Sequence, residues 1–313
     1  MAVSNGFGKI GVLMGGPSTE REISLKSGKA VYEALKGAGF DVEAIDLTTD
    51  DAAANAELIR LSGIECAFIA LHGRYGEDGQ IQLVLEHLKV PYTGSGVLAS
   101  RLAMDKISSR RIFEKCGIKV PRYSAFERSS RDKAKNDFGY PVVVKPATHG
   151  SSIGLSIVCN EEDFRKAVDL AFSFDKNIVV EEYIKGRELT VGILGRRALP
   201  VIEIIPKRQF FDFEAKYQAG MTDYVVPAHL GWPVARRARI AALAAHEALG
   251  CFGCSRVDIM LGEDNAAYVL EVNTIPGFTS TSLLPKAAGS IGVSFGNLCL
   301  QLIKFAYEKK KRQ

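Results

Sequence analysis

The sequence predicts an α/β protein of two or three domains, on the basis of its length, its composition and the order of its elements. With 313 residues, the chain is longer than one typical domain. Its hydrophobic content of 47% and charged content of 24% are ordinary for a soluble globular protein. From Ile10 to about Pro91, apolar strands alternate with helical segments, which indicates a parallel sheet covered by helices.

The first strand, Ile10 to Met14, turns into a helix through glycines that do not fit the dinucleotide-binding pattern G-x-G-x-x-G. Thr19 and Glu22 have the spacing of a capping box, which leaves Glu20 without a structural task. Glu20 is expected at the carboxyl end of the strand, where open α/β sheets bind ligands. It either holds a substrate ammonium or only stabilises the helix dipole.

The next buried strand, Ala67 to Leu71, is followed at once by His72 and a turn rich in glycine. Glycines allow the backbone to approach a ligand closely. An isolated histidine is more often structural, but this position favours a site residue. Pro91 to Gly96 then reads as a linker, after which Asp105-Lys106 opens an amphipathic helix.

Two later segments are expected to be lids. Residues 147–154 lie between the strands Tyr140 to Pro146 and Leu155 to Val158, whereas a Walker A loop leads into a helix. Their glycines, hydroxyls and free N–H groups suit a phosphate, which Lys145 can also reach. Residues 206–230 are long, aromatic and polar without a pattern of their own, which is typical of a binding loop.

A helix is predicted from Pro233 to Leu249, with Gly250 as its C-cap. Its expected apolar stripe contains Ile240, Leu243, Ala244 and Ala248. Its expected solvated face contains Arg236, Arg237 and Arg239.

A hairpin over residues 256–273 follows, with two arms that alternate between apolar and polar side chains. A two-residue turn at Asp264-Asn265 would set the register of this hairpin. A longer loop through Gly262 would make the same pairs diagonal neighbours. The predicted pairs are Asp258 with Glu271, and Arg256 with Asn273.

The hairpin is interpreted as a metal site. Opposed like charges destabilise a half-buried sheet unless one carboxylate is protonated or a cation lies between the two. Asp258, Glu271 and Asn273 supply the hard oxygen atoms that Mg²⁺ prefers. The alternative is a solvated face on which Arg256 neutralises Asp258. The segment Thr274 to Gly277 is an unusual way to leave a surface strand and therefore favours the metal site.

Charge and hydropathy argue against two classes of partner. The net charge is +4, of which Lys309, Lys310, Lys311 and Arg312 against Glu308 supply +3. The rest of the chain is nearly neutral, so we expect no nucleic-acid partner and a frayed, solvated basic tail. No signal peptide and no apolar run of membrane-spanning length is visible, so we expect no membrane partner.

The cysteines do not form a recognisable metal or disulfide pattern. Cys251 and Cys254 have C-x-x-C spacing, but no second pair and no histidine at ligand spacing accompanies them. We therefore expect buried thiols in a reducing compartment, and a cytoplasmic protein. A redox or zinc role for the pair is the less favoured alternative. The six cysteines are Cys66, Cys116, Cys159, Cys251, Cys254 and Cys299.

From Lys9 to about Phe305, the chain resembles the ATP-grasp superfamily, and within it the D-alanine–D-alanine ligase family. The resemblance rests on the order and spacing of GGPSTEREISL, HGRYGEDG, MDK, VVVKPATHGSSIG, EEYIKGRE, FEAKY, RVDIML and LEVNTIPGFTSTSLLP. It implies an ATP-grasp architecture in which a parallel α/β domain precedes two α+β domains that clasp ATP. The implied domains are residues 1–94, residues 95–189 with the glycine-serine lid, and residues 190–313 with the metal site and the aromatic loop.

The resemblance also implies roles for individual residues. The nucleotide-binding positions are Lys106, Lys145, Ser152, Glu181, Tyr183, Ile184, Glu188 and Lys216, with Glu181, Tyr183 and Ile184 at the adenine and Glu188 at the ribose. Two Mg²⁺ or Mn²⁺ ions are implied at Asp258, Glu271 and Asn273. Glu20 is implied to bind the first D-alanine, with Ser151 and Tyr217 as its partners on the lids. His72 is implied to lie beside the substrates. Arg256 and the backbone of Gly277 stabilise the oxyanion, and Ser282 and Leu283 hold the second D-alanine.

The implied reaction joins two D-alanines at the expense of ATP through a D-alanyl phosphate, for peptidoglycan precursors, and relatives are often homodimers. One alternative is an ATP-grasp ligase for another amino or hydroxy acid pair, against which the hydroxyl of Tyr217 argues. Another is a non-catalytic nucleotide sensor, against which Lys145 and the metal ligands argue. Arg110 stands where relatives often have lysine, which we expect to affect helix packing or charge rather than chemistry.

Overall fold

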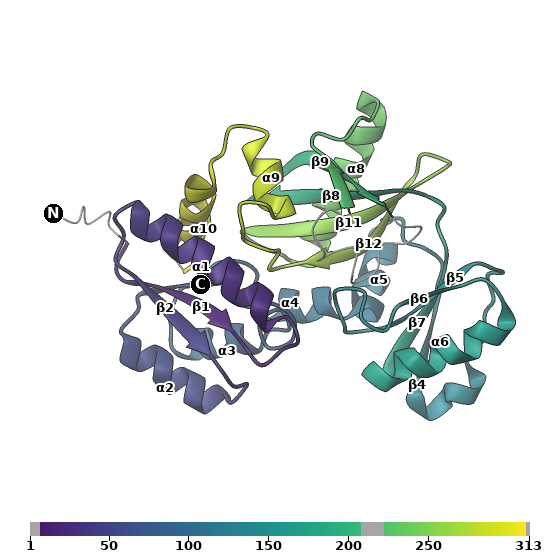
Figure 1. The fold of residues 1–313 in the computed structure, drawn as a ribbon, viewed down its shortest axis with the longest axis horizontal. Coiled ribbons are helices and arrows are strands. Elements are labelled where there is room, and N and C mark those ends of the chain that lie inside the picture. Colours follow the sequence, from purple (N-terminus) through teal and green to yellow (C-terminus); the bar gives the residue numbers. More distant parts are fainter. Residues whose placement is uncertain (1–6, 208–221, 311–313) are drawn as a thin grey trace.

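The computed structural model describes residues 7–207 and 222–310, which form three sheets with their covering helices. Figure 1 shows the three sheets as separate units, with α4 near the centre of the molecule. This mixed α/β architecture agrees with the predicted fold class. None of the helices in these two ranges is long and apolar enough to cross a membrane.

The sheet of the N-terminal unit is parallel, as predicted, and its three strands have the order β2-β1-β3. All residues of β1 and β3 are buried, because helices pack on both faces of the sheet. The strands are β1 (Ile10–Gly15), β2 (Val42–Leu47) and β3 (Cys66–Ile69), and the helices are α1 (Arg21–Gly37), α2 (Ala52–Ser62) and α3 (Gln80–His87).

The segment expected to be a linker is instead buried against this sheet. Tyr92 forms an isolated parallel bridge with Ala67, and Thr93 Oγ1 accepts a hydrogen bond from Ile69 N at 3.0 Å. The linker interpretation is wrong because these backbone groups find partners at the sheet edge. The segment leads into α4 (Val97–Met104) and then α5 (Lys106–Lys115), which Asp105 caps.

The second unit has a four-stranded sheet in the order β4-β7-β5-β6, in which all neighbours are antiparallel. One face packs on α6, whose buried Phe164, Val168 and Phe172 recur at helical spacing. Residues 147–154 join β5 to β6, which confirms the predicted strand-loop-strand arrangement. The elements are β4 (Tyr123–Glu127), η1 (Arg128–Lys133), β5 (Val142–Pro146), β6 (Ser156–Val158), α6 (Glu161–Phe174) and β7 (Asn177–Glu182).

The third unit has a five-stranded antiparallel sheet in the order β10-β9-β8-β11-β12. The sheet begins at Gly186. Strand β10 lies inside the segment that we expected to lack a pattern, whereas Lys216 and Tyr217 lie outside the described residues. The strands are β8 (Gly186–Leu194), β9 (Arg197–Pro206), β10 (Thr222–Val225), β11 (Cys254–Gly262) and β12 (Ala267–Asn273).

Helix α8 (Trp232–Ala248) packs on this sheet through alanines. Ala238 and Ala242 are fully buried, whereas Ile240, which was predicted for the apolar stripe, is 52% exposed. Ile240 is about 200° around the helix from both alanines and therefore points away from the sheet. The other predicted positions agree, with Leu243, Ala244 and Ala248 at the margin of the core and Arg236, Arg237 and Arg239 exposed.

The C-terminal helices return to the first sheet. Helix α9 (Leu283–Gly289) and helix α10 (Phe295–Lys310) share one core cluster with β1, β3 and α1. In this cluster, Leu302 and Ile303 of α10 pack with Ile10 and Phe68 of the N-terminal sheet. Figure 1 shows α10 beside α1. The N-terminal sheet and the C-terminal helices therefore share a core although they are distant in sequence.

The cysteines agree only in part with the expectation of buried thiols. All six are free, and Cys116 and Cys159 are exposed. Cys116 caps the end of α5, and Cys159 follows β6, so both lie where the chain turns at the surface. Burial raises the pKa of the Cys254 thiol to about 12, which makes a reactive thiolate unfavourable there.

Lys309 belongs to the basic segment that we expected to be frayed and solvated, and this expectation is wrong for it. Its Nζ lies 4.0 Å from the centroid of the Tyr92 ring and 6.0 Å from that of Phe252. These rings attract the ammonium through cation–π contacts. Burial nevertheless lowers the pKa of Lys309 to about 8, against the attraction of Glu86.

We expect the Lys309→Met substitution to show that burial of the Lys309 ammonium destabilises the folded protein at neutral pH. The unfolded chain binds the lysine proton more tightly than the folded one, so stability should rise as pH increases through about 8. Between pH 7 and pH 9.5, Lys309 should raise the free energy of unfolding of the wild type by about 2 kcal/mol. Urea unfolding at both pH values should therefore show the variant losing about 2 kcal/mol relative to wild type on going to the higher pH. Lys304→Met, on the exposed face of the same helix, is the control, and a pH-independent difference for Lys309→Met would contradict the prediction.

Candidate active site

The predicted carboxylate pair is present on the β11–β12 hairpin. Asp258 lies opposite Glu271, and Arg256 lies opposite Asn273. The two-residue turn behind this prediction is wrong, because residues 263–266 join the two strands. A β-bulge next to Asp258 takes up the difference in register and restores the predicted pairs.

Groups from three elements surround the two carboxylates. Arg256 donates two hydrogen bonds to Asp258, at 2.9 Å from Nε and 2.7 Å from Nη2. Thr190 on β8 donates another at 2.6 Å, and Lys106 Nζ on α5 lies 3.3 Å from Glu271 Oε2. The Arg256–Asp258 ion pair is therefore present, but Asp258 is only 7% exposed, so this face is not the solvated one of the alternative interpretation.

Asp258, Glu271 and Asn273 fit a divalent cation in their donor chemistry. They present oxygen atoms from neighbouring positions of one hairpin, and all three line the same cavity. A carboxylate has about four lone-pair sites, so the hydrogen bonds to Asp258 leave acceptor capacity. Asn273 Oδ1 also accepts a hydrogen bond from Ile275 N at 2.9 Å, which fixes its amide. The three residues can therefore hold Mg²⁺.

A cavity of about 410 Å³ lies between the second and third sheets, a size typical of small-molecule sites. It brings together all the predicted nucleotide-binding residues except Lys216, which lies outside the described ranges. Apolar side chains such as Val143, Met260 and Leu270 form part of its wall. The predicted residues that line it are Lys106, Lys145, Ser152, Glu181, Tyr183, Ile184 and Glu188.

Lys145 and Glu181 form a buried ion pair in this cavity, with 2.7 Å between Nζ and Oε1. Burial lowers the pKa of Lys145 to about 8, although the attraction of Glu181 opposes the shift. Burial raises the pKa of Glu181, but the attraction of Arg110 and Lys145 outweighs burial and holds this pKa below its usual range. Glu181 is therefore ionised at neutral pH.

The glycine-serine loop 147–154 reaches the N-terminal unit. Ser151 Oγ donates a hydrogen bond to Glu20 Oε1 at 2.5 Å, and Lys106 Nζ donates one to His149 O at 2.7 Å. Ser151 and Ser152 have φ values of 53° and 58°, which strain residues other than glycine. A strained loop held across two units has the geometry of a lid.

Glu20 is the N-cap residue of α1, so the capping box predicted for Thr19 and Glu22 is wrong. Its side chain makes no capping hydrogen bond within the described structure and instead contacts Ser151. Gly73 has a φ of 70°, and a Cβ atom there would lie 2.6 Å from Glu20 Oε2. The close backbone approach expected at this glycine turn is therefore an approach to Glu20.

A further cavity of about 790 Å³ contains the predicted amino-acid-binding residues that the structure describes. It meets the first cavity at Lys106, Asp258 and Glu271, which line both. Ser282 is the N-cap residue of α9, and its hydroxyl contacts Thr279, at 3.1 Å from N and 2.8 Å from Oγ1. The predicted residues that line this cavity also include Glu20, His72, Ser151, Arg256, Asn273, Gly277 and Leu283.

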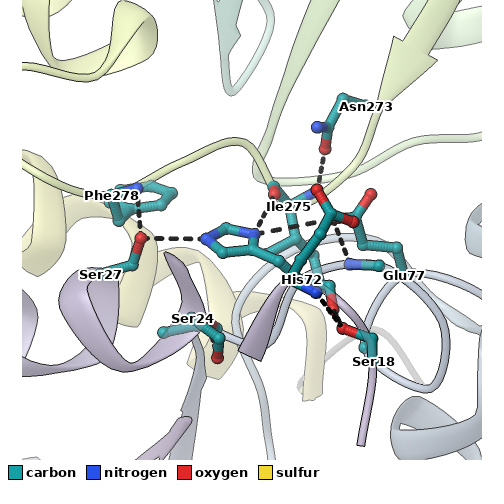
Figure 2. A network of polar contacts seen from close by, with 12 residues as sticks. Ser18, Ser24, Ser27, His72, Glu77, Asn273, Ile275 and Phe278 are labelled. Atoms are coloured by element: carbon teal, nitrogen blue, oxygen red, sulfur yellow. Dashed lines mark hydrogen bonds and ion pairs between the residues drawn. The ribbon is translucent and has the colours of Figure 1, made fainter. Parts of the chain in front are cut away.

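His72 lies in a buried network that joins the first unit to the segment after β12 (Figure 2). Its Nε2 is 2.9 Å from Ser27 Oγ, and its Nδ1 is 3.2 Å from Ile275 O. A neutral ring protonated on Nδ1 satisfies both contacts, because a carbonyl oxygen can only accept. Ser27 Oγ then accepts a hydrogen bond from Phe278 N at 3.2 Å.

A carboxyl group completes this network. Glu77 Oε1 lies 3.6 Å from His72 Nδ1 and accepts a hydrogen bond from Gly73 N at 3.0 Å. Burial raises the pKa of Glu77, while the nearby imidazole of His72 opposes the shift. In the described structure, the ring nitrogens of His72 thus face protein groups that fix the loop carrying Gly277. Its expected role beside the substrates stays a prediction.

Three residues of the site were not predicted as such. They are Thr190, Ser27 and Arg110, the partners of Asp258, His72 and Glu181. The sequence held a signal for two of them, because Ser27 follows the buried Ser24 at helical spacing and Arg110 lies one turn after Lys106. Thr190 gave no such signal, since its partner lies on a neighbouring strand.

Family models match nearly the whole chain. The model described as D-ala D-ala ligase N-terminus matches residues 9–58 and 50–95, and the model described as D-ala D-ala ligase C-terminus matches residues 112–304. The D-alanine–D-alanine ligase of Geotalea uraniireducens (strain Rf4) is 50% identical over 299 residues, which are 95% of each chain.

Solved structures agree with the family models. The D-alanine–D-alanine ligase of Bacillus anthracis has a TM-score of 0.87 at 36% identity, and its complex with ATP has a TM-score of 0.84 at 33% identity. Both alignments cover 97% of this chain and 99% of the other. The VanG D-Ala:D-Ser ligase of Enterococcus faecalis has a TM-score of 0.83 at 31% identity, with 96% and 99% covered. The chain therefore belongs to the D-alanine–D-alanine ligase family and has its ATP-grasp fold.

Proposed function

We propose that the chain joins two D-alanines to D-alanyl-D-alanine at the expense of ATP, through a D-alanyl phosphate. The observation that carries this proposal is the meeting of two cavities at Lys106, Asp258 and Glu271. A nucleotide in the smaller cavity and an amino acid in the larger one would face each other across these charges. The D-alanine–D-alanine ligases among the relatives support the same substrates.

The smaller cavity is proposed to hold ATP. Glu181, Tyr183 and Ile184 would line the adenine pocket and Glu188 would bind the ribose, while Ser152, in the lid loop, would lie near the phosphates. Lys106 and Lys145 carry the positive charge of this cavity, and Lys216 would add to it. Asp258, Glu271 and Asn273 would hold Mg²⁺ or Mn²⁺, as two ions, which neutralise phosphate charge when bound.

The larger cavity is proposed to hold both amino acids. Glu20 offers a carboxylate for the ammonium of the first D-alanine, and Ser151 closes the lid over it. In the first step, the carboxylate of this D-alanine attacks the γ-phosphorus of ATP and ADP leaves. Tyr217 would join Ser151 in shielding the acyl phosphate from water.

The second step joins the amino acids. The amine of the second D-alanine attacks the acyl carbon and phosphate leaves. Arg256 and the backbone N–H of Gly277 are proposed to stabilise the oxyanion, since donors aimed at developing charge lower the barrier. Ser282 and Leu283 are proposed to hold the carboxylate of the second D-alanine, and His72 to lie beside the substrates.

A peptidoglycan-precursor role, a cytoplasmic location and a homodimer are further proposals, supported by the family resemblance. A second candidate function is the ligation of another amino or hydroxy acid pair. The similarity to the VanG D-Ala:D-Ser ligase favours this alternative for the acceptor. The domain boundaries after residues 94 and 189 also stay proposals.

Turnover with a panel of acceptors tests the proposal. We expect ADP, phosphate and D-alanyl-D-alanine in equal amounts when ATP, Mg²⁺ and D-alanine are all present, and no product when the metal is removed by a chelator. Mn²⁺ should restore activity. D-serine, D-lactate and L-alanine are the comparison substrates, with products identified by mass. Equal turnover with L-alanine would contradict the substrate assignment and leave the family assignment intact.

Glu271→Gln tests the metal site. The substitution should lower turnover by about a hundredfold or more, because it removes a charged metal ligand. Stability should change by less than about 1 kcal/mol, since the repulsion with Asp258 disappears together with the contact to Lys106. Glu263→Gln, in the exposed loop of the same hairpin, is the control. Full activity of Glu271→Gln at limiting Mg²⁺ would show that the hairpin is not the metal site.

Ser282→Ala tests the acceptor site. A hydrogen bond to a charged group is worth roughly 1.5–3 kcal/mol, so binding of the second D-alanine should weaken about ten- to a hundredfold. Binding of ATP and of the first D-alanine should stay within about twofold. Thr279→Val removes the hydrogen bond between the two side chains but keeps the Ser282 hydroxyl and its bond to Thr279 N, and serves as the control. If both variants weaken the second D-alanine equally, Ser282 only stabilises the loop.

A further inference from the structure

Arg110, which was expected to affect helix packing or charge rather than chemistry, belongs to the charge network beside the smaller cavity. It lies one turn after Lys106 on α5 and is fully buried. Its guanidinium forms an ion pair with Glu181, and its Cζ lies 5.2 Å from the centroid of the Tyr123 ring. Burial and the aromatic face therefore fix the guanidinium in place.

Glu181 has two cationic partners that differ in their freedom to move. Lys145 Nζ contacts Oε1 at 2.7 Å, whereas Arg110 contacts Oε2. Both Lys145 and Glu181 line the smaller cavity, but Arg110 lies behind the carboxylate and is absent from the described lining. Lys145 can therefore turn toward a ligand in the cavity, while Arg110 stays with Glu181.

We propose that Arg110 is a positioning residue, which keeps Glu181 ionised and in place while Lys145 turns from this carboxylate to the phosphates of the nucleotide. The inference rests on the proposed function, because it requires a nucleotide in this cavity. A buried ion left without its partner is strongly destabilising. With Arg110 present, Glu181 keeps a partner at every stage. Without it, nucleotide binding must either leave Glu181 unpaired or leave Lys145 bound to it.

The difference between a flexible and a fixed partner follows from side-chain chemistry. Lysine carries a point charge on a flexible stem, whereas the planar guanidinium of arginine binds carboxylates in a fixed geometry. In the described structure, Glu181 is the one carboxylate within ion-pair distance of Arg110. When ATP binds and Lys145 turns away, Arg110 thus still provides a positive charge beside Glu181.

Arg110→Met should raise the KM for ATP and the Kd of a non-hydrolysable ATP analogue about ten- to a hundredfold, while the KM for D-alanine stays unchanged. Arg110→Lys, which restores a positive charge without the planar guanidinium, should recover only part of this loss. Arg111→Met, on the exposed face of the same helix, is the matched control and should bind like wild type. A general structural role of Arg110 would instead change both KM values together.

The double variant Arg110→Met/Glu181→Gln separates the proposal from simple packing. With Glu181 neutral, Arg110→Met should weaken the analogue by less than about threefold relative to Glu181→Gln alone. If Arg110→Met does not fold, the double variant should restore folding. Nucleotide affinity unchanged in Arg110→Met, or a loss equally large in the Gln background, would overturn the proposal. Failure of the wild-type protein to bind the analogue would instead refute the proposed function.

Discussion

The opposed carboxylates Asp258 and Glu271 are the constraint on which the rest of the structure depends. Two like charges facing each other on a buried hairpin require compensation, and the chain supplies it from separate elements. Arg256 comes from the same strand, Thr190 from the neighbouring strand and Lys106 from α5. The need to balance this pair therefore draws the third sheet and the central helices to one point, where both cavities open.

A second cluster of buried charges lies at the smaller cavity. There a single carboxylate, Glu181, has two cations, Arg110 and Lys145, whereas the two carboxylates of the hairpin are balanced by Arg256 and Lys106. The cluster at Glu181 thus has an excess of positive charge, which suits the phosphates of a nucleotide. Apolar side chains form part of the cavity wall, and burial strengthens both sets of interactions.

Local patterns of the sequence predicted much of the fold and of the site. The facing of Asp258 and Glu271 followed from alternation and survived an error in the turn, because a bulge compensated for it. Predictions were wrong where the burial of a residue depends on parts of the chain that are distant in sequence. The buried segment after Pro91, the exposed Ile240 and the enclosed Lys309 are set by packing between elements that no local period reveals. Lys216 and Tyr217 stay predictions.

The network of Ser27, His72 and Phe278 has a consequence for how such a chain can be inherited. It joins residues up to 251 positions apart through buried hydrogen bonds, and each partner is useful only if the others are present. If the N-terminal unit were replaced by that of a distant relative, the new α1 surface would not match the loop that carries Phe278. Substitutions in the first unit at this contact are therefore expected to be accompanied by compensating substitutions in the third.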